Sequence, residues 1–134
     1  MKRWDREIPV IRKERPHLQI LTCHDEYLSH TMFDVDGALV GYGCIAPGPL
    51  IEMIAAGKAK DYKKVREIHD RLLPVTANVY HRGSHMEGSV ALKWALVARG
   101  ILEHAEVRSP LLPLAAGADK EIFAAMQAAG LGKV

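Results

Sequence analysis

The chain has 134 residues, of which 49% are hydrophobic and 25% are charged, a composition typical of a globular domain rather than a disordered protein. Its formal charge is only +2, from 18 basic and 16 acidic residues that are mixed along the chain, so nucleic acid is not indicated as a partner. No apolar run approaches the roughly 20 residues that span a bilayer, and the charged N-terminus lacks the apolar stretch of a signal peptide. We therefore predict a cytoplasmic protein of one domain with no membrane partner.

The first half of the chain predicts a helix and two parallel strands. Residues 2–16 place apolar side chains on one helical stripe, although Pro9 should kink or shorten this helix. Two largely apolar runs follow, at residues 18–22 and 37–46, with a short predicted helix at residues 26–33 between them. Apolar runs without alternation are typical of strands buried on both faces, and a helical connection allows such strands to lie parallel.

The second half of the chain predicts helices. In chain order they are expected at residues 47–59, 63–80, 88–100 and 120–130, with a loop at residues 81–88 and a proline-rich connector at residues 107–117. The second of these helices should be kinked at Pro74, and one of its faces is apolar. That face is formed by Val65, Ile68, Leu72 and Val79. Asp119 is expected to cap the start of the last helix, and Gly130 its end.

Two parallel strands do not form a complete sheet. Parallel sheets occur with both faces covered and are usually wider than two strands. Further strands are therefore expected from outside this chain. Within the chain there is no repeat and no convincing linker, so we expect one cooperative unit.

Several separate stretches, in this order, resemble a single protein family. They are LQILTCHDEYL, VDGALVGYGCIAP, DYKKVREIHDRLLPV, ALKWALVARGI, VRSPLLPL and a final helix that ends in AAGL. The chain resembles the dihydrodipicolinate synthase and N-acetylneuraminate lyase family from about residue 18 to residue 131. The resemblance implies an α/β fold, the (β/α)8 TIM barrel with a C-terminal helical bundle, and Schiff-base lyase chemistry on 2-keto acids.

The resemblance covers only the C-terminal half of a family member. It implies that residues 1–58 form a partial barrel with its last two strands, and that residues 59–134 form a helical region packed on it. The family's chemistry needs an imine-forming lysine on the sixth strand, which would fall upstream of Met1, and Lys2 lies too close to the first predicted helix to replace it. The tyrosines of the chain also match other positions than the family's proton-relay tyrosine. These are Tyr27, Tyr42, Tyr62 and Tyr80. We therefore expect no catalytic residue in this truncated or split chain, which alone is predicted to be inactive.

The stretch after the first apolar run is the main candidate for a substrate-binding site. It consists of Cys23, His24, Asp25 and Glu26. Active sites of such barrels lie at the C-terminal ends of the strands, and in sugar-acid members of the family a Gly-Tyr-Asp-Glu sequence there holds the substrate hydroxyls. Since a carboxylate accepts several hydrogen bonds, the resemblance favours a 2-keto-3-deoxy sugar acid over aspartate semialdehyde. On the second strand, the residues implied to face the keto acid or sugar are Leu39, Val40 and Gly41.

The same residue types have structural alternatives. Asp25 and Glu26 could be the cap and the first-turn acid of the helix that follows them. A role in capping does not exclude a role in substrate binding for the same carboxylate. Cys23 and Cys44 are expected to be small core residues with reduced thiols, rather than nucleophiles or a disulfide.

A metal site is not predicted. His81 and His85 are four residues apart, as metal ligands on a helix would be, but Gly83 between them favours a loop. No third ligand stands at a recognised spacing. We expect neither a metal nor another cofactor.

Two functions of different classes remain open. In the first, a complementary N-terminal half supplies the lysine, and the completed protein is an aldolase or dehydratase of a 2-keto sugar acid. In the second, the chain is a non-catalytic structural or binding remnant that associates with itself. Unpaired strand edges favour association in both cases, so the expected partner is a second copy or the missing half. The sequence decides neither the keto acid nor the choice between carbon–carbon cleavage and loss of water.

Overall fold

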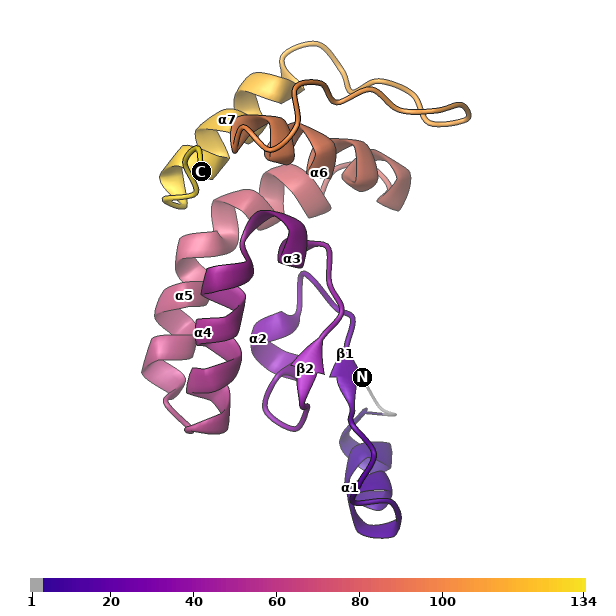
Figure 1. Ribbon diagram of the computed structural model, residues 1–134, viewed down its shortest axis with the longest axis vertical. Helices are drawn as coiled ribbons and strands as arrows, with labels where there is room; N and C mark the ends of the chain where they lie inside the picture. Colours follow the sequence, from indigo (N-terminus) through magenta and orange to yellow (C-terminus); the bar gives the residue numbers. More distant parts are fainter. Residues whose placement is uncertain (1–3) are drawn as a thin grey trace.

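The computed structural model describes residues 4–134, and their side chains from Arg6 onward. Lys2 lies outside the described residues, so its exclusion as the imine lysine stays a prediction. The elements are α1 (Trp4–Glu14), β1 (Leu21–Thr22), α2 (Leu28–Thr31), β2 (Gly37–Ala38), α3 (Tyr42–Ile45), α4 (Pro47–Lys58), α5 (Tyr62–Val75), the π-helix η1 (Thr76–Tyr80), α6 (His85–Ala98) and α7 (Ala118–Ala128). Figure 1 shows α1 at one end, the two strands beside α4 and α5 in the middle, and α6 with α7 at the other end.

The two strands pair in parallel, which confirms the predicted arrangement. Leu21 lies opposite Gly37 and Thr22 opposite Ala38. The backbone N–H of Leu39 also donates to the carbonyl oxygen of Thr22 at 2.8 Å, which extends the pairing by one bond. The carboxyl ends of both strands therefore meet at one edge, where the polar stretch after β1 begins.

The prediction that both strands are buried on both faces is wrong. Thr22 is buried, but the side chains of Leu21 and Leu39 are 54% and 74% exposed. Flanking strands and covering helices bury such side chains in a complete parallel sheet. Within residues 4–134, only β1 and β2 belong to the sheet, so the outer edge of each strand is unpaired there.

The strand predicted at residues 37–46 is much shorter than expected, and the run also contains the helix α3. β2 ends at Ala38, and the chain enters α3 at Tyr42 and α4 at Pro47. The apolar character of this run therefore marks burial rather than strand conformation, since Tyr42 and Ile45 are almost completely buried. Short apolar runs do not by themselves distinguish a strand from a buried helix.

The largest part of the core lies between α4, α5 and the segments that carry the strands. α4 packs closely on this core, because a Cβ at Gly57 would meet the sulfur of Met32 at 3.1 Å. The apolar face predicted for the second long helix is confirmed: each of its side chains is at most 4% exposed. They are Val65, Ile68, Leu72 and Val79. The division of the chain into residues 1–58 and 59–134 stays a prediction, because α4 and α5 pack along each other on either side of residue 58.

The two prolines inside helices have different effects. α1 continues through Pro9 to Glu14, so the predicted shortening of this helix is wrong. Pro74 lies two residues before the point at which α5 gives way to the π-helix η1 at Thr76. The side-chain amide of Asn78 donates to the carbonyl oxygen of Pro74 at 2.9 Å, which satisfies a carbonyl in this irregular region. The π-helix η1 ends at Tyr80, and this residue lies near the carboxyl ends of the strands.

The layer formed by α6 and α7 begins earlier than predicted and is capped differently. α6 starts at His85, not at Gly88, because the hydroxyl of Ser84 caps it by accepting a hydrogen bond from the N–H of Glu87 at 3.3 Å. The N-cap of α7 is Gly117 in a left-handed conformation, with φ +87°, so the prediction of Asp119 as the cap is wrong. Asp119 lies in the first turn, where its charge favours the positive end of the helix.

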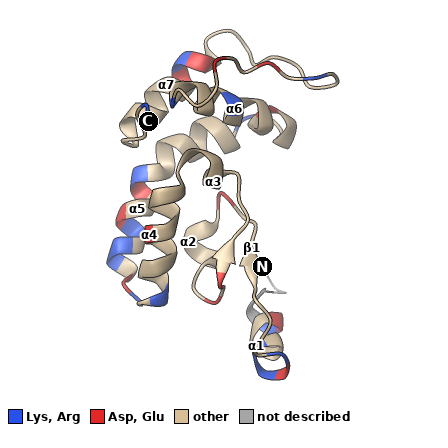
Figure 2. Ribbon diagram, viewed as in Figure 1, with Lys and Arg blue, Asp and Glu red and all other residues tan. Residues whose placement is uncertain are grey.

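Arg12 links the N-terminal helix to the segments that carry the strands, and Ile8 of the same helix belongs to the core. The guanidinium of Arg12 donates to the carbonyl oxygens of Leu18 and Asp34, at 3.1 and 3.0 Å, and to the carboxylate of Asp36 at 2.8 Å. The N–H of Ile20 also donates to that carboxylate, and these two bonds lower the pKa of Asp36. Figure 2 shows that charged residues lie mainly on α1, α5 and the chain segments around α6 and α7. Among residues 4–134, no helix has the length and apolar character needed to cross a membrane.

Candidate functional site

A pocket of about 590 Å³ lies at the carboxyl ends of the two strands. We call it the strand-end pocket; its walls come from the segment after β1, from Gly41 after β2, and from η1 and α6. The lining residues are Cys23, His24, Asp25, Glu26, Tyr27, Gly41, Tyr80, His85, Gly88, Ser89 and Leu92. This is the position at which parallel α/β barrels carry their active sites.

The structure brings together most, but not all, of the residues predicted for the site. The four residues of the stretch after β1 and Gly41 line the strand-end pocket. Leu39 and Val40 do not: Leu39 points outward with 74% of its side chain exposed, and Val40 packs against the core. Both residues follow β2, which ends at Ala38, and their side chains face solvent and the core respectively, not the pocket.

Asp25 ties the two strand ends together. Its Oδ1 accepts a hydrogen bond from the N–H of Tyr42 at 2.7 Å, and its Oδ2 accepts one from the N–H of Gly41 at 3.2 Å. These N–H groups begin α3, so Asp25 caps a helix that starts 17 residues further along the chain. A carboxylate at this place is favoured by both the charge-assisted bonds and the helix dipole.

The alternative role expected for Asp25 and Glu26, at the start of the helix directly after them, is not found. α2 begins at Leu28 with Tyr27 at its N-cap, and its first turn contains no acidic residue. Glu26 lines the strand-end pocket and also a much smaller cavity between α2, α4 and α5. Its carboxylate is therefore half-buried between the candidate site and the core.

Tyr80 forms the floor of the strand-end pocket beside Gly41. Its ring packs on the ring of Tyr42, with centroids 4.8 Å apart, and a Cβ at position 41 would meet the Tyr80 hydroxyl at 2.9 Å. Glycine at position 41 is therefore required by this close approach. The side chain of Leu92 would also lie only 3.3 Å from that Cβ.

The hydroxyl of Tyr80 is buried and lies near the carboxylate of Asp25. It makes no hydrogen bond of regular geometry with any described residue. Burial raises the pKa of Tyr80 well above its usual range, and the negative charge of Asp25 raises it further. The phenol is therefore a neutral hydrogen-bond donor whose nearest anionic neighbour is Asp25.

The second phenol, Tyr42, has its hydrogen bonds satisfied in the core. Its hydroxyl donates to the carbonyl oxygen of Leu72 at 3.2 Å and lies 2.5 Å from the hydroxyl oxygen of Thr76. Burial raises the pKa of Tyr42 above its usual range. Tyr42 therefore connects the start of α3 to the junction between α5 and η1. Tyr80 is the last residue of η1.

The cysteines and histidines differ from their predicted environments. Cys23 and Cys44 are both exposed, so the prediction that they are core residues is wrong; Cys44 lies on the outer side of the short helix α3. His85 is the first residue of α6 and lines the strand-end pocket, whereas His81 lies in the turn before it. Residues 4–134 contain no group of three or more His, Cys, Asp or Glu side chains that could hold a metal ion.

Six lining residues of the pocket were not predicted from the sequence: Tyr27, Tyr80, His85, Gly88, Ser89 and Leu92. His85 and Ser89 lie on one face of α6, and the pattern Ser84-x-x-Glu87, typical of a capping box, could have located the start of that helix. Tyr80 has no such signal. Pro74 predicts a break in its helix but not the π-helical turn, and the π-helical turn decides which way Tyr80 points.

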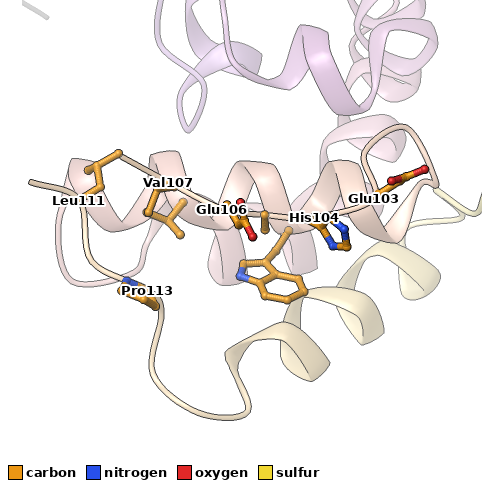
Figure 3. Close-up of a pocket in the computed structure, with 9 residues that line it drawn as sticks. Glu103, His104, Glu106, Val107, Leu111 and Pro113 are labelled. Atoms are coloured by element: carbon orange, nitrogen blue, oxygen red, sulfur yellow. The ribbon is translucent and has the colours of Figure 1, made fainter. Parts of the chain in front are cut away.

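A second large hollow lies away from the strands, between α6 and the connector that follows it. Its volume is about 490 Å³, and Val90 and Trp94 of α6 form one wall. Figure 3 shows the connector residues Glu106, Val107 and Leu111 running along α6. The ammonium group of Lys93 donates to the carbonyl oxygen of Glu106 at 2.6 Å and holds this connector in place.

Two parallel strands joined through a helix, with polar side chains gathered at their carboxyl ends, are the unit that α/β barrels repeat. The model of the dihydrodipicolinate synthetase family matches residues 3–129. The chain belongs to this family.

Curated relatives and solved structures agree with this membership. The chain is 34% identical over 88 residues to a 4-hydroxy-tetrahydrodipicolinate synthase of Aromatoleum aromaticum, which covers 65% of the chain and 28% of the relative. It is 36% identical over 99 residues to a synthase of the same name from Bartonella tribocorum, which covers 69% of the chain and 32% of the relative. The chain thus spans about a third of the length of these relatives.

The solved structures establish the fold. A dihydrodipicolinate synthase from Bacteroides thetaiotaomicron matches with a TM-score of 0.76 at 22% identity, over 88% of this chain and 40% of that one. A monomeric dihydrodipicolinate synthase variant matches with a TM-score of 0.81 at 21% identity, over 97% of this chain and 42% of that one. Nearly the whole chain therefore has the fold of part of a dihydrodipicolinate synthase.

Proposed function

We propose that this chain forms the C-terminal part of a Schiff-base lyase, and that the strand-end pocket binds the end of the substrate remote from the imine. The observation that carries the proposal is the convergence of Cys23, Asp25 and Gly41 at the carboxyl ends of two adjacent parallel strands. Family membership supports it independently.

The imine-forming lysine is proposed to come from another polypeptide segment. No lysine of the described residues lines the strand-end pocket. The incoming amine would attack the keto carbon, and the carbonyl oxygen would leave as water. In carbon–carbon cleavage, the iminium would accept the electron pair of the bond between C3 and C4 and become an enamine, while a base takes the proton of the C4 hydroxyl and the remote fragment leaves as an aldehyde.

The place for that segment is the open side of the sheet. The outer edges of β1 and β2 have no partner strand among residues 4–134, and the exposed side chains of Leu21 and Leu39 stand beside them. Unpaired, apolar strand edges favour association with another strand. A complementary half of the barrel would cover these side chains and bring its lysine to the same end of the sheet.

The substrate is proposed to be a 2-keto-3-deoxy sugar acid. Asp25 uses one acceptor position of each oxygen for the backbone of α3, so further positions remain for ligand hydroxyls. His24, His85 and Ser89 add donors and acceptors to the same walls. The names of the curated relatives support a competing substrate, that of a 4-hydroxy-tetrahydrodipicolinate synthase.

A second candidate function is a non-catalytic protein that associates with itself. The same exposed leucines favour it, because a second copy could cover the open strand edges. The lyase would react covalently with a keto acid once the lysine-bearing segment is supplied, whereas the non-catalytic protein would not.

Borohydride trapping tests the proposal. The purified chain would be incubated with pyruvate or a 2-keto-3-deoxy sugar acid, reduced, and weighed by intact-protein mass spectrometry, with its molar mass in solution measured in parallel. We expect no adduct on the chain alone, and an adduct on the added polypeptide when the lysine-bearing N-terminal half of a family member is supplied. An adduct on a lysine of this chain would refute the proposed origin of the lysine.

Two further outcomes separate the candidates. If the added half binds but forms no adduct, while the chain alone has the mass of two or more copies, the non-catalytic protein is favoured. If pyruvate gives an adduct but the 2-keto-3-deoxy sugar acid gives none, either whole or as its cleavage product, the synthase replaces the sugar-acid lyase. Asp25→Asn is the variant to compare with the wild type in these trapping experiments, because it removes a charge from the strand-end pocket without changing the side-chain size.

A further inference from the structure

The connection between α6 and α7 projects from the body of the chain as an arm. We call residues 101–117 the connector arm; they contain neither helix nor strand, and a connection of more than about 15 residues without regular structure is uncommon in a compact domain unless it is functional. Figure 1 shows the arm running back along α6, passing beyond the start of that helix and returning to α7. A hydrogen bond from the N–H of Leu111 to the carbonyl oxygen of Arg108, at 3.0 Å, closes a turn within it.

Contacts within the chain hold the arm in this position. Besides the hydrogen bond from Lys93 to the carbonyl oxygen of Glu106, the side chains of Val107 and Leu111 line the hollow above Trp94 of α6 (Figure 3). The arm therefore has a defined position without a partner. Binding to such a segment costs less conformational entropy than ordering a disordered one.

The outer part of the arm and the start of α6 form an apolar hollow of about 350 Å³, which we call the arm hollow. It is lined by residues 110–113 of the arm and by Ser84, Met86 and Glu87. Met86 is 54% exposed and Leu112 is 78% exposed, as large as the exposed fractions of the leucines beside the strands. Glu87 is the one charged residue in this lining. The arm hollow therefore suits an apolar side chain of a partner.

The first turn of α6 separates the arm hollow from the strand-end pocket. Met86 and Glu87 line the arm hollow, whereas His85 and Ser89 line the strand-end pocket. In Figure 1 the arm extends toward the side of the sheet on which β1 lies, and α4 and α5 lie on the other side. A polypeptide that pairs with the outer edge of β1 would therefore lie on the same side of the molecule as the arm.

The part of the family's fold that this chain does not contain is large enough to reach both places. The chain covers 28% and 32% of the two curated relatives described above, so about two thirds of such a protein lies outside the match. Because only one helical turn separates the arm hollow from the strand-end pocket, a partner of that size that pairs with β1 would also meet the arm.

We propose that the arm hollow is a docking site for the lysine-bearing half of the barrel. An apolar side chain of that half fills the space between Met86 and Leu112, while its edge strand pairs with β1. This inference rests on the proposed function, since it assigns a second contact to the partner that this function requires. The two contacts lie on either side of the strand-end pocket, so the docked half encloses that pocket from the open side of the sheet.

The affinity of the chain for the lysine-bearing N-terminal half of a family member tests this proposal. The two polypeptides would be co-expressed, purified and titrated against each other by sedimentation. M86S/L112S removes both exposed apolar side chains of the arm hollow and should weaken association by about tenfold or more. The matched control I51S/L73S removes two exposed apolar side chains from α4 and α5 and should associate as the wild type does. Both double variants should unfold at the wild-type temperature, since exposed substitutions rarely change stability.

A third double variant, L21S/L39S, distinguishes failure of this inference from failure of the proposed function. If L21S/L39S weakens association while M86S/L112S does not, the half pairs with the sheet without reaching the arm, and only the docking site is refuted. If the wild type does not associate with the half at all, the docking site and the proposed origin of the lysine both fail. If M86S/L112S instead lowers the molar mass of the chain alone, a second copy occupies the arm hollow and the proposed occupant is wrong.

Discussion

The packed face of α5 and the two-stranded sheet differ in how far their large apolar side chains are buried. On α5, Leu72 and Val65 are at most 4% exposed, whereas Leu21 and Leu39 beside the strands are 54% and 74% exposed. The packed face of α5 is covered by other parts of the chain, whereas these leucines beside the strands are covered by no described residue to a comparable extent. The strand region therefore presents an exposed apolar surface, and the strand-end pocket adjoins it.

Truncation of a leucine on each side gives the largest contrast. Leu72→Ala should lower the free energy of unfolding by about 2–5 kcal/mol, because it leaves a cavity in the core. Leu39→Ala should change it by less than about 0.5 kcal/mol, since its side chain contacts mainly solvent. Urea unfolding followed by circular dichroism measures both. Equal losses would mean that the strand region is covered in solution, and the molar mass would then identify a second copy.

Filling the space at Gly41 should have the next largest effect. Gly41→Ala places a Cβ 2.9 Å from the Tyr80 hydroxyl and should destabilise the protein by about 1–3 kcal/mol. Tyr80→Phe removes that oxygen and should recover a large part of the loss in the double variant. Thermal unfolding of the four proteins forms a double-mutant cycle. Strictly additive changes would contradict the close approach of the two residues.

The cap on α3 predicts a smaller loss. Asp25→Asn keeps the size of the side chain but removes its charge and one acceptor, and should cost about 1–2 kcal/mol. Asp34→Asn, at an exposed position near the strands, is the control and should have no measurable effect. Chemical denaturation of both variants checks the difference. A neutral result for Asp25→Asn would show that α3 does not depend on this carboxylate.

The smallest predicted effect is a dependence of stability on pH. Burial lowers the pKa of His69 below 6.5, so the unfolded chain binds a proton at a higher pH than the folded one does. The stabilisation is fully present above pH 6.5 and decreases as the pH falls through the lowered folded-state value. His69→Gln should flatten this part of the stability curve, whereas His17→Gln at an exposed position should not.

The parts of the fold that the sequence predicts depend on local patterns. The apolar face of α5 follows from helical periodicity, and Gly130, with φ +69°, follows from the preference for glycine after a helix. The parallel pairing of the strands was also predictable, from the length and helical character of their connection. Each of these features is decided by residues close together in the chain.

The features that could not be predicted depend on contacts between distant residues. Asp25 caps α3 from 17 residues away, so neither the helix nor the cap has a local signal. Cys44 looked like a core residue because its neighbours are apolar, but the turn into α3 places it outside. For the site, the sequence located the stretch after β1 but not Tyr80, whose direction depends on the π-helical turn.

α3 has only four residues, Tyr42–Ile45, which is far too short for a helix that is stable on its own. A negative charge from Asp25 meets its first N–H groups, and a positive charge from Arg99 meets the carbonyl oxygen of its last residue. Its dipole is therefore stabilised at both ends by side chains from other parts of the chain. Loss of either charge is therefore expected to weaken this short helix, although neither Asp25 nor Arg99 belongs to it.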